Sequence, residues 1–234
     1  MRAGIVVFPG SNCDADARWV LEEKLGLSCR MLWHKERIQG ELDLIVLPGG
    51  FSYGDYLRTG AIAAVSPVMQ DVRRHARRGG LVLGICNGFQ ILCESGLLPG
   101  ALMTNIGLRF LCRDVFLRVE RLDTPFSRAL ERHNVLRMPI AHHGGRYVCS
   151  EDELERLEDQ RRVLFRYCDG EGRATDEANP NGSLHNIAGI LGEEGRVLGM
   201  MPHPERAAEA AQGGDDGLAL FQSLLGAVET LASL

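Results

Sequence analysis

A cysteine between two glycines is the part of this chain best suited to chemistry. Cys86 follows a short uncharged run, Leu81–Ile85, and precedes residues with the spacing of a helix. In the G-x-S-x-G nucleophile elbow, a strained turn between a strand and a helix lifts the nucleophile off the sheet edge, and this segment is the cysteine form of that pattern. The helix N-terminus would favour the thiolate over the thiol. We therefore expect Cys86 to be a nucleophile, although a cysteine in a βα turn can also be a core residue.

The two glycines strengthen the prediction of an elbow. A Cβ atom at Gly84 or Gly88 would collide where the strand and the helix pack closely, so glycine has a steric reason at both positions. The helix is predicted over 87–95, and Gly96 ends it. With both glycines in place, the catalytic interpretation of Cys86 outweighs the structural one.

A thiolate nucleophile needs a proton acceptor and a group that orients this acceptor. The candidates lie in the segment Pro202-His203-Pro204-Glu205, whose two prolines restrict the backbone. Residues i and i+2 of an extended segment share a face, so the Glu205 carboxylate is predicted to reach the His203 imidazole and fix its tautomer. Alone, this segment is better explained by an exposed histidine beside an acid. Together with the cysteine elbow, it predicts a catalytic pair.

The oxyanion formed by the attack needs N–H donors. One donor should be the backbone N–H after the nucleophile, at Asn87. The second is expected from the loop Pro48-Gly49-Gly50-Phe51, which follows a predicted strand, because its glycines let the backbone approach a ligand closely. A plain turn would also explain two glycines after a proline.

Composition limits the classes of function. The 234 residues suit one α/β domain spanning 1–234, and 45% hydrophobic residues suffice for a full core. With 26 basic and 31 acidic residues the net charge is −5, so nucleic acid is not an expected partner. Seven scattered cysteines without a C-x-x-C pair indicate a reducing compartment. We expect a cytoplasmic protein without membrane association, because no signal peptide precedes the first strand and no apolar run is long enough to cross a bilayer.

The histidines do not indicate a metal site. His142 and His143 are adjacent, so their side chains should point apart, and neither H-x-H nor H-x-x-x-H accompanies them. The cysteine spacing does not fit a zinc ribbon either. We therefore expect no bound metal.

The elements that position these residues alternate in the first half of the chain. Apolar runs predict four strands, over 3–8, 28–33, 43–47 and 81–85. Helices lie between them, including one over 60–78 that is bent or restarted at Pro67. This alternation predicts an α/β fold with a mostly parallel central sheet and helices on both faces.

The second half of the chain is more β-like and is expected to be antiparallel or mixed in part. Strands are predicted within 108–122, 135–140, 163–167, and on both sides of a turn at 192–195. Ser150-Glu151-Asp152-Glu153 has the capping-box sequence that opens a helix. The polar stretch 169–183 reads as a loop, and the last helix is predicted over 216–231.

Several segments together resemble the triad-type, class I glutamine amidotransferases. The elbow, the Pro-Gly-Gly-Phe loop and the Pro-His-Pro-Glu segment carry this resemblance. Narrower motifs resemble the glutaminase subunit of phosphoribosylformylglycinamidine synthase of the short PurQ type, and they cover nearly the whole chain. These motifs are 8–14 (FPGSNCD), 49–58 (GGFSYGDYLR), 179–183 (NPNGS), 186–190 (NIAGI) and 199–206 (GMMPHPER).

The resemblance implies a flavodoxin-like fold and the hydrolysis of glutamine to glutamate and ammonia. Cys86 would attack the amide carbon and form a γ-glutamyl thioester that water hydrolyses. His203 would act first as a base and then protonate the leaving ammonia, with Glu205 orienting it. Gly50 and Asn87 would supply the oxyanion N–H groups.

The resemblance also implies a glutamine pocket. Phe51 lies there and stays open as the upstream oxyanion donor, and Gln90 matches a position that helps to hold glutamine. One segment departs from the family. Residues 139–147 read P-I-A-H-H-G-G-R-Y, where the family usually reads P-I-A-H-G-E-G-R-Y. His142 and His143 are therefore expected at the pocket, with His143 and Gly144 in place of a glycine and a glutamate.

The resemblance implies partners as well. Ammonia would pass to an ATP-dependent synthase subunit, which carries ATP and magnesium and converts formylglycinamide ribonucleotide to the amidine in purine synthesis, and a small subunit would bridge the complex. No cofactor is expected on this chain, which has no G-x-x-x-x-G-K-[ST] loop. Two other hypotheses stay open: a free-standing γ-glutamyl amidase or glutaminase of another synthase, and a non-catalytic regulatory α/β protein.

Overall fold

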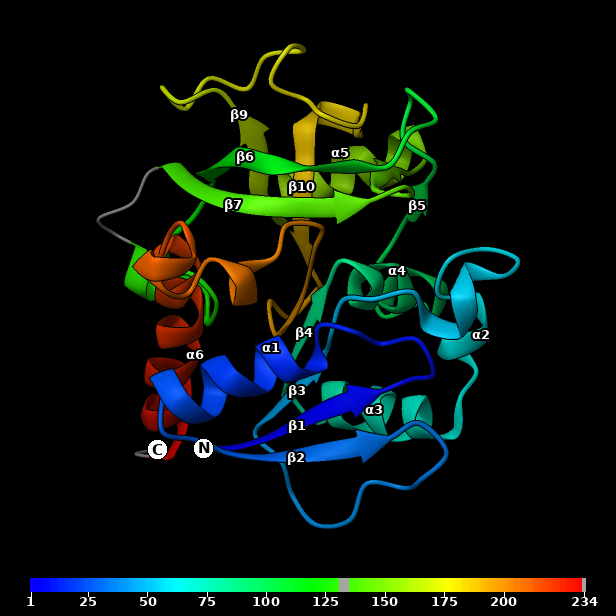
Figure 1. The fold of residues 1–234 in the computed structure, drawn as a ribbon, viewed down its shortest axis with the longest axis vertical. Coiled ribbons are helices and arrows are strands. Elements are labelled where there is room, and N and C mark those ends of the chain that lie inside the picture. The colour runs from blue at the N-terminus through cyan, green and yellow to red at the C-terminus, as the bar shows by residue number, and fades with distance from the viewer. Residues whose placement is uncertain (131–134, 233–234) are drawn as a thin grey trace.

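A nine-stranded mixed sheet organises the fold of the computed structural model, which describes residues 1–130 and 135–232. The strand order is β2-β1-β3-β4-β11-β10-β9-β6-β7 (Figure 1). The strands are β1 (Arg2–Val7), β2 (Ser28–Trp33), β3 (Leu44–Leu47), β4 (Leu81–Ile85), β6 (Leu111–Val119), β7 (Val135–His142), β9 (Val163–Cys168), β10 (Ile187–Leu191) and β11 (Val197–Met200). A separate antiparallel pair consists of β5 (Ala101–Met103) and β8 (Arg146–Val148).

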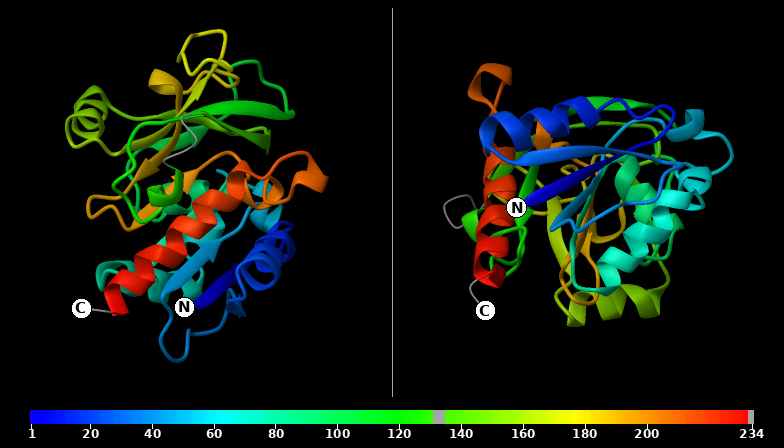
Figure 2. Two further views of the ribbon diagram at one scale, coloured as in Figure 1. Left: turned by 90° about the vertical axis from the view of Figure 1, so that its left-hand side faces the viewer. Right: turned by 90° about the horizontal axis from the view of Figure 1, so that it is seen from below.

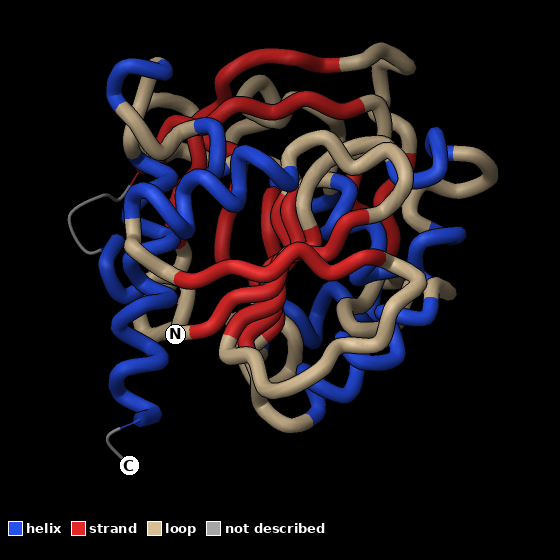
Figure 3. The backbone as a smooth tube through the Cα atoms, turned by 60° about the horizontal axis from the view of Figure 1, so that its bottom comes forward, coloured by secondary structure: helices blue, strands red, loops and turns tan. Residues whose placement is uncertain are grey.

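The five adjacent strands β2, β1, β3, β4 and β11 run parallel. Every residue of β3 and β4 is buried, because helices cover both faces of this half of the sheet. Figures 2 and 3 show helices on the two sides of the strands. These helices are α1 (Asp14–Trp19), continued by a π-helical turn (Val20–Lys24), α3 (Pro67–Arg77), α4 (Asn87–Glu94) and α6 (Asp216–Ala232). The predicted parallel sheet with two covered faces is confirmed.

The other half of the sheet is antiparallel. β11 pairs in parallel with β4 on one side and antiparallel with β10 on the other, and β10, β9, β6 and β7 continue antiparallel. The turn predicted at 192–195 joins β10 to β11, so the predicted mixed second half is confirmed. At the start of α5 (Glu151–Asp159), the Ser150 hydroxyl accepts a hydrogen bond from the Glu153 N–H at 3.3 Å, as the capping-box sequence predicts.

The structure also confirms the break predicted at Pro67 and the loop predicted over 169–183. The helix predicted over 60–78 is split into α2 (Ala61–Ala64) and α3, because Pro67 occupies the first position of α3. The stretch 169–183 contains no helix or strand. Short 3₁₀ turns lie at Ser52–Asp55, Arg128–Leu130, Leu184–Asn186, Pro204–Arg206 and Ala210–Gln212. Within the described ranges, no helix is long and apolar enough to span a membrane.

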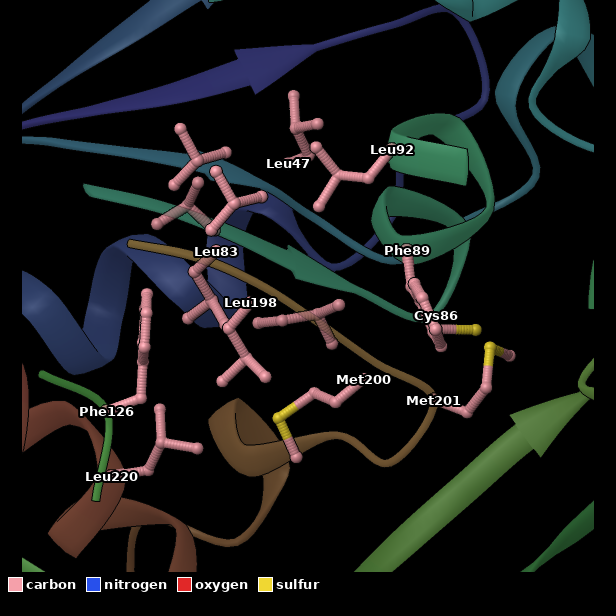
Figure 4. Packing of buried hydrophobic residues seen from close by; sticks show 14 of the residues in the cluster. Leu47, Leu83, Cys86, Phe89, Leu92, Phe126, Leu198, Met200, Met201 and Leu220 are labelled. Carbon is pink, nitrogen blue, oxygen red and sulfur yellow. The ribbon is translucent and has the colours of Figure 1, made fainter. Parts of the chain in front are cut away.

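The core brings several strand ends to one edge of the sheet. Fully buried side chains from three parallel strands and α4 form one cluster, labelled in Figure 4 as Leu47, Leu83, Leu198 and Phe89. Leu47 pairs with Gly84 and Met200 pairs with Ile85, so the chain leaves β3, β4 and β11 at nearly the same level. Ligand sites of parallel α/β sheets form at the carboxyl ends of the strands. The predicted site residues that follow these strands therefore lie at one edge.

Gly88 is a position at which this packing tolerates no side chain. An added Cβ atom would lie 1.9 Å from the Leu47 carbonyl oxygen, which belongs to the backbone and cannot rotate away. We expect Gly88→Ala to lower the free energy of unfolding by about 3 kcal/mol or more, measured by urea titration. Gly107→Ala is the matched control, because nothing lies within 4 Å of a Cβ atom there. Equal unfolding midpoints for the two variants would contradict this close approach.

Candidate active site

Cys86 forms the turn between β4 and α4 in a conformation that L-residues rarely adopt, with φ 50° and ψ −103°. Two hydrogen bonds hold the turn: the Cys86 N–H donates to the Met200 carbonyl at 2.8 Å, and the Gln90 N–H donates to the Cys86 carbonyl at 3.2 Å. Such strain costs about 1–3 kcal/mol and persists only where the surroundings hold it. A Cβ atom at Gly84 would lie 2.8 Å from the Gly88 backbone, so the steric reason predicted for the two glycines is confirmed.

The Cys86 side chain is buried at this edge of the sheet. The residue is 4% exposed, and its Sγ lies 3.7 Å from the Ala141 carbonyl oxygen. Figure 4 shows the Met201 side chain beside it. Cys86 is also the N-cap residue of α4, so the N-terminus of that helix lies next to the sulfur.

His203 and Glu205 form a hydrogen-bonded pair. The His203 Nδ1 lies 2.6 Å from the Glu205 Oε1, and both residues are 2% exposed. The predicted contact is confirmed, but the predicted extended segment is wrong. Pro204 begins a 3₁₀ turn, Pro204–Arg206, and the carboxylate reaches the imidazole through this turn. The His203 N–H donates to the Pro139 carbonyl at 2.9 Å, which anchors the pair to β7.

Opposing effects set the pKa of His203. Burial lowers this pKa by disfavouring the imidazolium, but the Glu205 carboxylate and the Cys86 sulfur raise it, and the result lies well above the ordinary histidine value. The imidazolium is therefore favoured at neutral pH. Its Nε2 has no hydrogen-bond partner in the described part of the chain, so this nitrogen can exchange a proton with a bound molecule.

The two predicted oxyanion donors keep free N–H groups. Neither the Gly50 N–H nor the Asn87 N–H has an acceptor within 1–130 and 135–232. The Phe51 N–H, in contrast, donates to the Gly10 carbonyl at 2.8 Å, so it is already used. Gly50 has φ 147°, and a Cβ atom there would lie 2.8 Å from the Asn12 nitrogen, so this tight approach requires glycine.

Gln90 belongs to a chain of side-chain hydrogen bonds that joins three segments. The Ser52 N–H donates to the Asn87 Oδ1 at 3.2 Å, and the Asn87 Nδ2 donates to the Gln90 Oε1 at 2.9 Å. The Gln90 Nε2 then donates to the Gly144 carbonyl at 2.6 Å. The elbow helix is thereby tied to the loop after β3 and to the loop after β7. We call this the Ser52–Gly144 relay.

His142 and His143 point apart, as predicted: His142 is buried, at 2% exposure, and His143 is exposed. Asn105 fixes the tautomer of His142. The Asn105 Nδ2 donates to the His142 and Arg109 carbonyls, so its Oδ1 is an acceptor, and the His142 Nδ1 at 3.2 Å must carry the proton. Burial, with a smaller contribution from His203, lowers the pKa of His142 to about 3. His142 is therefore neutral.

The group best arranged to hold a metal within the described chain is Cys13, His203 and Glu205, whose ligand atoms lie within 4.8 Å of one another. Two contacts oppose this use. The His203 Nδ1 and the Glu205 Oε1 are bonded to each other, and the Arg206 Nη2 places a positive charge 3.1 Å from the Cys13 Sγ. We therefore interpret the group as a hydrogen-bonded network.

Neither Cys13 nor Asn105 was predicted from the sequence to lie at the site. Cys13 follows the turn after β1, so the rule that parallel strands end at one edge would have placed it near Cys86. Asn105 lies between β5 and β6, and its contact with His142 crosses 37 positions of the chain. No local pattern signals such a contact.

Comparison with known proteins gives a consistent result. Residues 1–215 match the family model of the CobB/CobQ-like glutamine amidotransferase domain. The chain is 55% identical over 232 residues to the phosphoribosylformylglycinamidine synthase subunit PurQ of Salinibacter ruber, with 99% of each chain covered. It is 55% identical over 228 residues to the same subunit of Koribacter versatilis, with 97% of this chain and 99% of the relative covered. The structure of PurLQS from Thermotoga maritima contains a chain that matches with a TM-score of 0.86 and 46% identity, over 97% of this chain and 98% of that chain.

The neutral state of His142 makes stability depend on pH. Its pKa of about 3 in the folded chain lies below the ordinary value of about 6.5, so the unfolded chain takes up the proton first as the pH falls. The stability contributed by the neutral imidazole is complete above about pH 6.5 and is lost as the pH falls towards 3. Between about pH 7.5 and about pH 5 the loss is about 2 kcal/mol.

We expect His142→Gln to remove about 2 kcal/mol of this pH dependence, measured by urea titration at the two pH values. His143→Gln is the matched control, because that side chain is exposed. The same pH dependence in His142→Gln and in the unaltered chain would show that His142 is not held neutral.

Proposed function

The chain belongs to the CobB/CobQ-like glutamine amidotransferase family, and from this membership we propose that it is the glutaminase subunit of a phosphoribosylformylglycinamidine synthase. The observation that carries the proposal is the strained Cys86 turn at the same sheet edge as the buried His203–Glu205 pair. In this proposal Cys86 is the nucleophile, His203 is the acid and base, and Glu205 orients the imidazole.

In the proposed reaction, His203 holds the proton given up by Cys86 as an imidazolium, and the thiolate attacks the amide carbon of glutamine. The carbonyl electrons move to the oxygen, and the His203 Nε2 gives its proton to the amide nitrogen. The C–N bond breaks, ammonia leaves and a γ-glutamyl thioester remains on Cys86. Water then attacks the thioester with His203 as base, which releases glutamate and restores the thiol. The Glu205 carboxylate holds the Nδ1 proton throughout, which is the role of the third member of a triad.

We assign the oxyanion hole to the N–H groups of Gly50 and Asn87. Both lack an acceptor in the described part of the chain, whereas the Phe51 N–H is already bonded to Gly10, which supports Gly50 as the upstream donor. Donors of this kind contribute about 10²–10³ in kcat each when they are aimed at the developing charge.

We place the substrate glutamine between the loop after β3 and the loop after β7. Phe51 belongs to the first loop, His142 ends β7, and His143 begins the second loop. Gln90 supports this placement, because its side-chain amide joins the two loops through the Ser52–Gly144 relay. A Cβ atom at Gly144 would have only ordinary contacts, the nearest at 3.5 Å to the Gln90 Nε2, so a methyl group would fit there without displacing a neighbour.

We further propose that the ammonia is used by an ATP-dependent synthase subunit, which holds ATP and magnesium, and that a small subunit bridges the complex. The name PurLQS given to the Thermotoga maritima structure supports an assembly of this kind. Exposed apolar side chains on two loops beside the site also support docking of a partner: Phe51, Tyr56, Leu57, Ile106, Leu108 and Phe110. The rings of Phe51 and Phe110, 6.3 Å apart, join the two loops.

A cytoplasmic location is part of the same proposal. All seven cysteines are free thiols, which supports a reducing compartment. We propose no cofactor on this chain, because the reaction needs only the nucleophile, the acid–base pair and the N–H donors.

The experiment that tests the proposed function is glutamate release from glutamine by the purified chain, alone and with the synthase subunit, the bridging subunit and their substrates. We expect weak release by the chain alone and strong stimulation by the partners. Equal release with and without them would favour a free-standing amidase. No release in a verified complex would contradict the catalytic role.

Cys86→Ala separates the two chemistries of the complex. We expect it to abolish glutamine-dependent synthesis, because no thioester can form, while synthesis from added ammonia continues. Product formation with each nitrogen source is the measurement. Cys112→Ala is the matched control, because it removes an exposed thiol on β6. Loss of both activities in an assembled Cys86→Ala complex would argue against separate use of ammonia by the partner.

A further inference from the structure

Cys13 is a second buried thiol at the site. It is 2% exposed and immediately precedes α1. Its N–H donates to the Gly49 carbonyl at 3.2 Å, so its backbone holds the residue before the proposed oxyanion donor. The proposed reaction does not use its sulfur.

The Cys13 sulfur is an acceptor for a guanidinium. The Arg206 Nη2 donates to the Sγ at 3.1 Å, and the Arg206 Nε donates to the Asp16 Oδ2 at 3.2 Å. The thiol itself donates to the Asn12 Oδ1 at 3.2 Å. Burial raises the pKa of Cys13 more than its neighbours lower it, so the sulfur carries a proton and no charge at neutral pH.

Arg206 directly follows Glu205 but does not pair with it. A guanidinium normally forms strong, often bidentate, bonds with a carboxylate. The Glu205 Oε2 is buried and has no hydrogen-bond partner among the described residues, so it would be a strong acceptor for such a bond. Arg206 instead uses the Cys13 sulfur and Asp16. The guanidinium is thus bound by acceptors other than the Glu205 oxygen.

Packing places the Cys13 sulfur beside the His203–Glu205 pair. The Cys13 Sγ, a His203 ring nitrogen and a Glu205 carboxylate oxygen lie within 4.8 Å of one another. A Cβ atom on Gly49 would lie 3.0 Å from the Sγ and 2.7 Å from the His203 Cε1, so the sulfur and the imidazole pack against the same glycine. The sulfur thus lies beside the acid–base pair and also binds the guanidinium.

We propose that Cys13 is a positioning residue for the acid–base pair: its uncharged sulfur binds Arg206, separates it from Glu205 and so leaves the Glu205 carboxylate to His203. The catalytic meaning of this role rests on the proposed glutaminase function. Without the sulfur, Arg206 gains access to the free Glu205 oxygen, and the carboxylate then supports the guanidinium in place of the imidazolium.

The direct test is the imidazole titration of His203, followed by NMR with Cys86→Ala as the starting chain. The charged and titratable groups around this imidazole are Glu205, Arg206, Cys13, Cys86, His142 and Asp16. We expect added Cys13→Ala to lower the His203 pKa by about one unit or more, because the hydrogen bond between the sulfur and the imidazole is lost and the carboxylate is shared with Arg206. Further addition of Arg206→Met should raise the pKa by more than Arg206→Met raises it in the chain that keeps Cys13. An unchanged titration, or an equal effect of Arg206→Met with and without Cys13, would overturn the proposal.

Turnover gives the second readout, with Cys86 intact. We expect Cys13→Ala to lower kcat about ten-fold or more with a smaller effect on KM, because the base is misplaced. The alkaline limb of the kcat/KM profile should move to lower pH, because the imidazolium loses its proton earlier. Cys13→Ser keeps an acceptor for Arg206 and should recover most of the loss. Cys168→Ala is the matched control, a thiol 3% exposed on β9. A lower rate with an unchanged pH profile would show that Cys13 is an ordinary core residue.

Arg206→Met alone keeps the proposal testable if Cys13→Ala does not fold. We expect it to leave the His203 pKa unchanged or higher, because a positive charge is removed and Glu205 stays with His203. A lower pKa would mean that Arg206 itself supports the imidazolium, which contradicts the role given to Cys13. The NMR titration does not need turnover. A chain without glutaminase activity therefore counts against the proposed function, and only the titration decides the role of Cys13.

Discussion

The site depends on how closely the elbow helix α4 approaches β3 and β4. At Gly88 the backbone of α4 lies so near the Leu47 carbonyl that a single methyl group would collide with it. This close approach fixes where α4 begins. The hydrogen bond from the Cys86 N–H to the Met200 carbonyl fixes where β4 ends. The strained conformation of Cys86 is stable because both ends are held, so its cost of about 1–3 kcal/mol is offset by packing elsewhere. The Cys86 sulfur is therefore held in position by the chain itself.

A buried acid–base pair is the second constraint, and it is electrostatic. Two ionisable groups that are each 2% exposed would be strongly destabilised if either were unpaired. The 2.6 Å bond between His203 and Glu205 offsets part of this cost, and the 3₁₀ turn between them keeps the bond in place. The same burial leaves the Glu205 Oε2 without a partner, so the arrangement is open to competition from any nearby cation. Residues outside the pair must therefore keep other cations away from the Glu205 Oε2.

Features with a local cause could be predicted from the sequence. The strand, turn and helix around Cys86 follow from the glycine spacing, and the opposite orientation of His142 and His143 follows from their adjacency. The place of β11 beside β4 could not be predicted, because that pairing joins residues more than one hundred positions apart and depends on the whole sheet. The His203–Glu205 contact was predicted for an incorrect reason, because proline favours the first position of a helical turn as readily as extended backbone. The position of Cys13 could have been predicted from the end of β1 at the same sheet edge, whereas Asn105 acts through a contact between distant segments that no local pattern encodes.

The Ser52–Gly144 relay connects the exposed apolar loops to the buried site. Ser52 adjoins the exposed Phe51, and the Asn105 N–H donates to the His143 carbonyl at 2.8 Å, so both exposed loops connect to ends of the relay. The middle of the relay consists of Asn87 and Gln90, which belong to the rigid elbow helix. A displacement of either loop would therefore break a hydrogen bond of the relay or move the proposed pocket wall. Docking on these loops would act on the pocket while leaving the nucleophile in place.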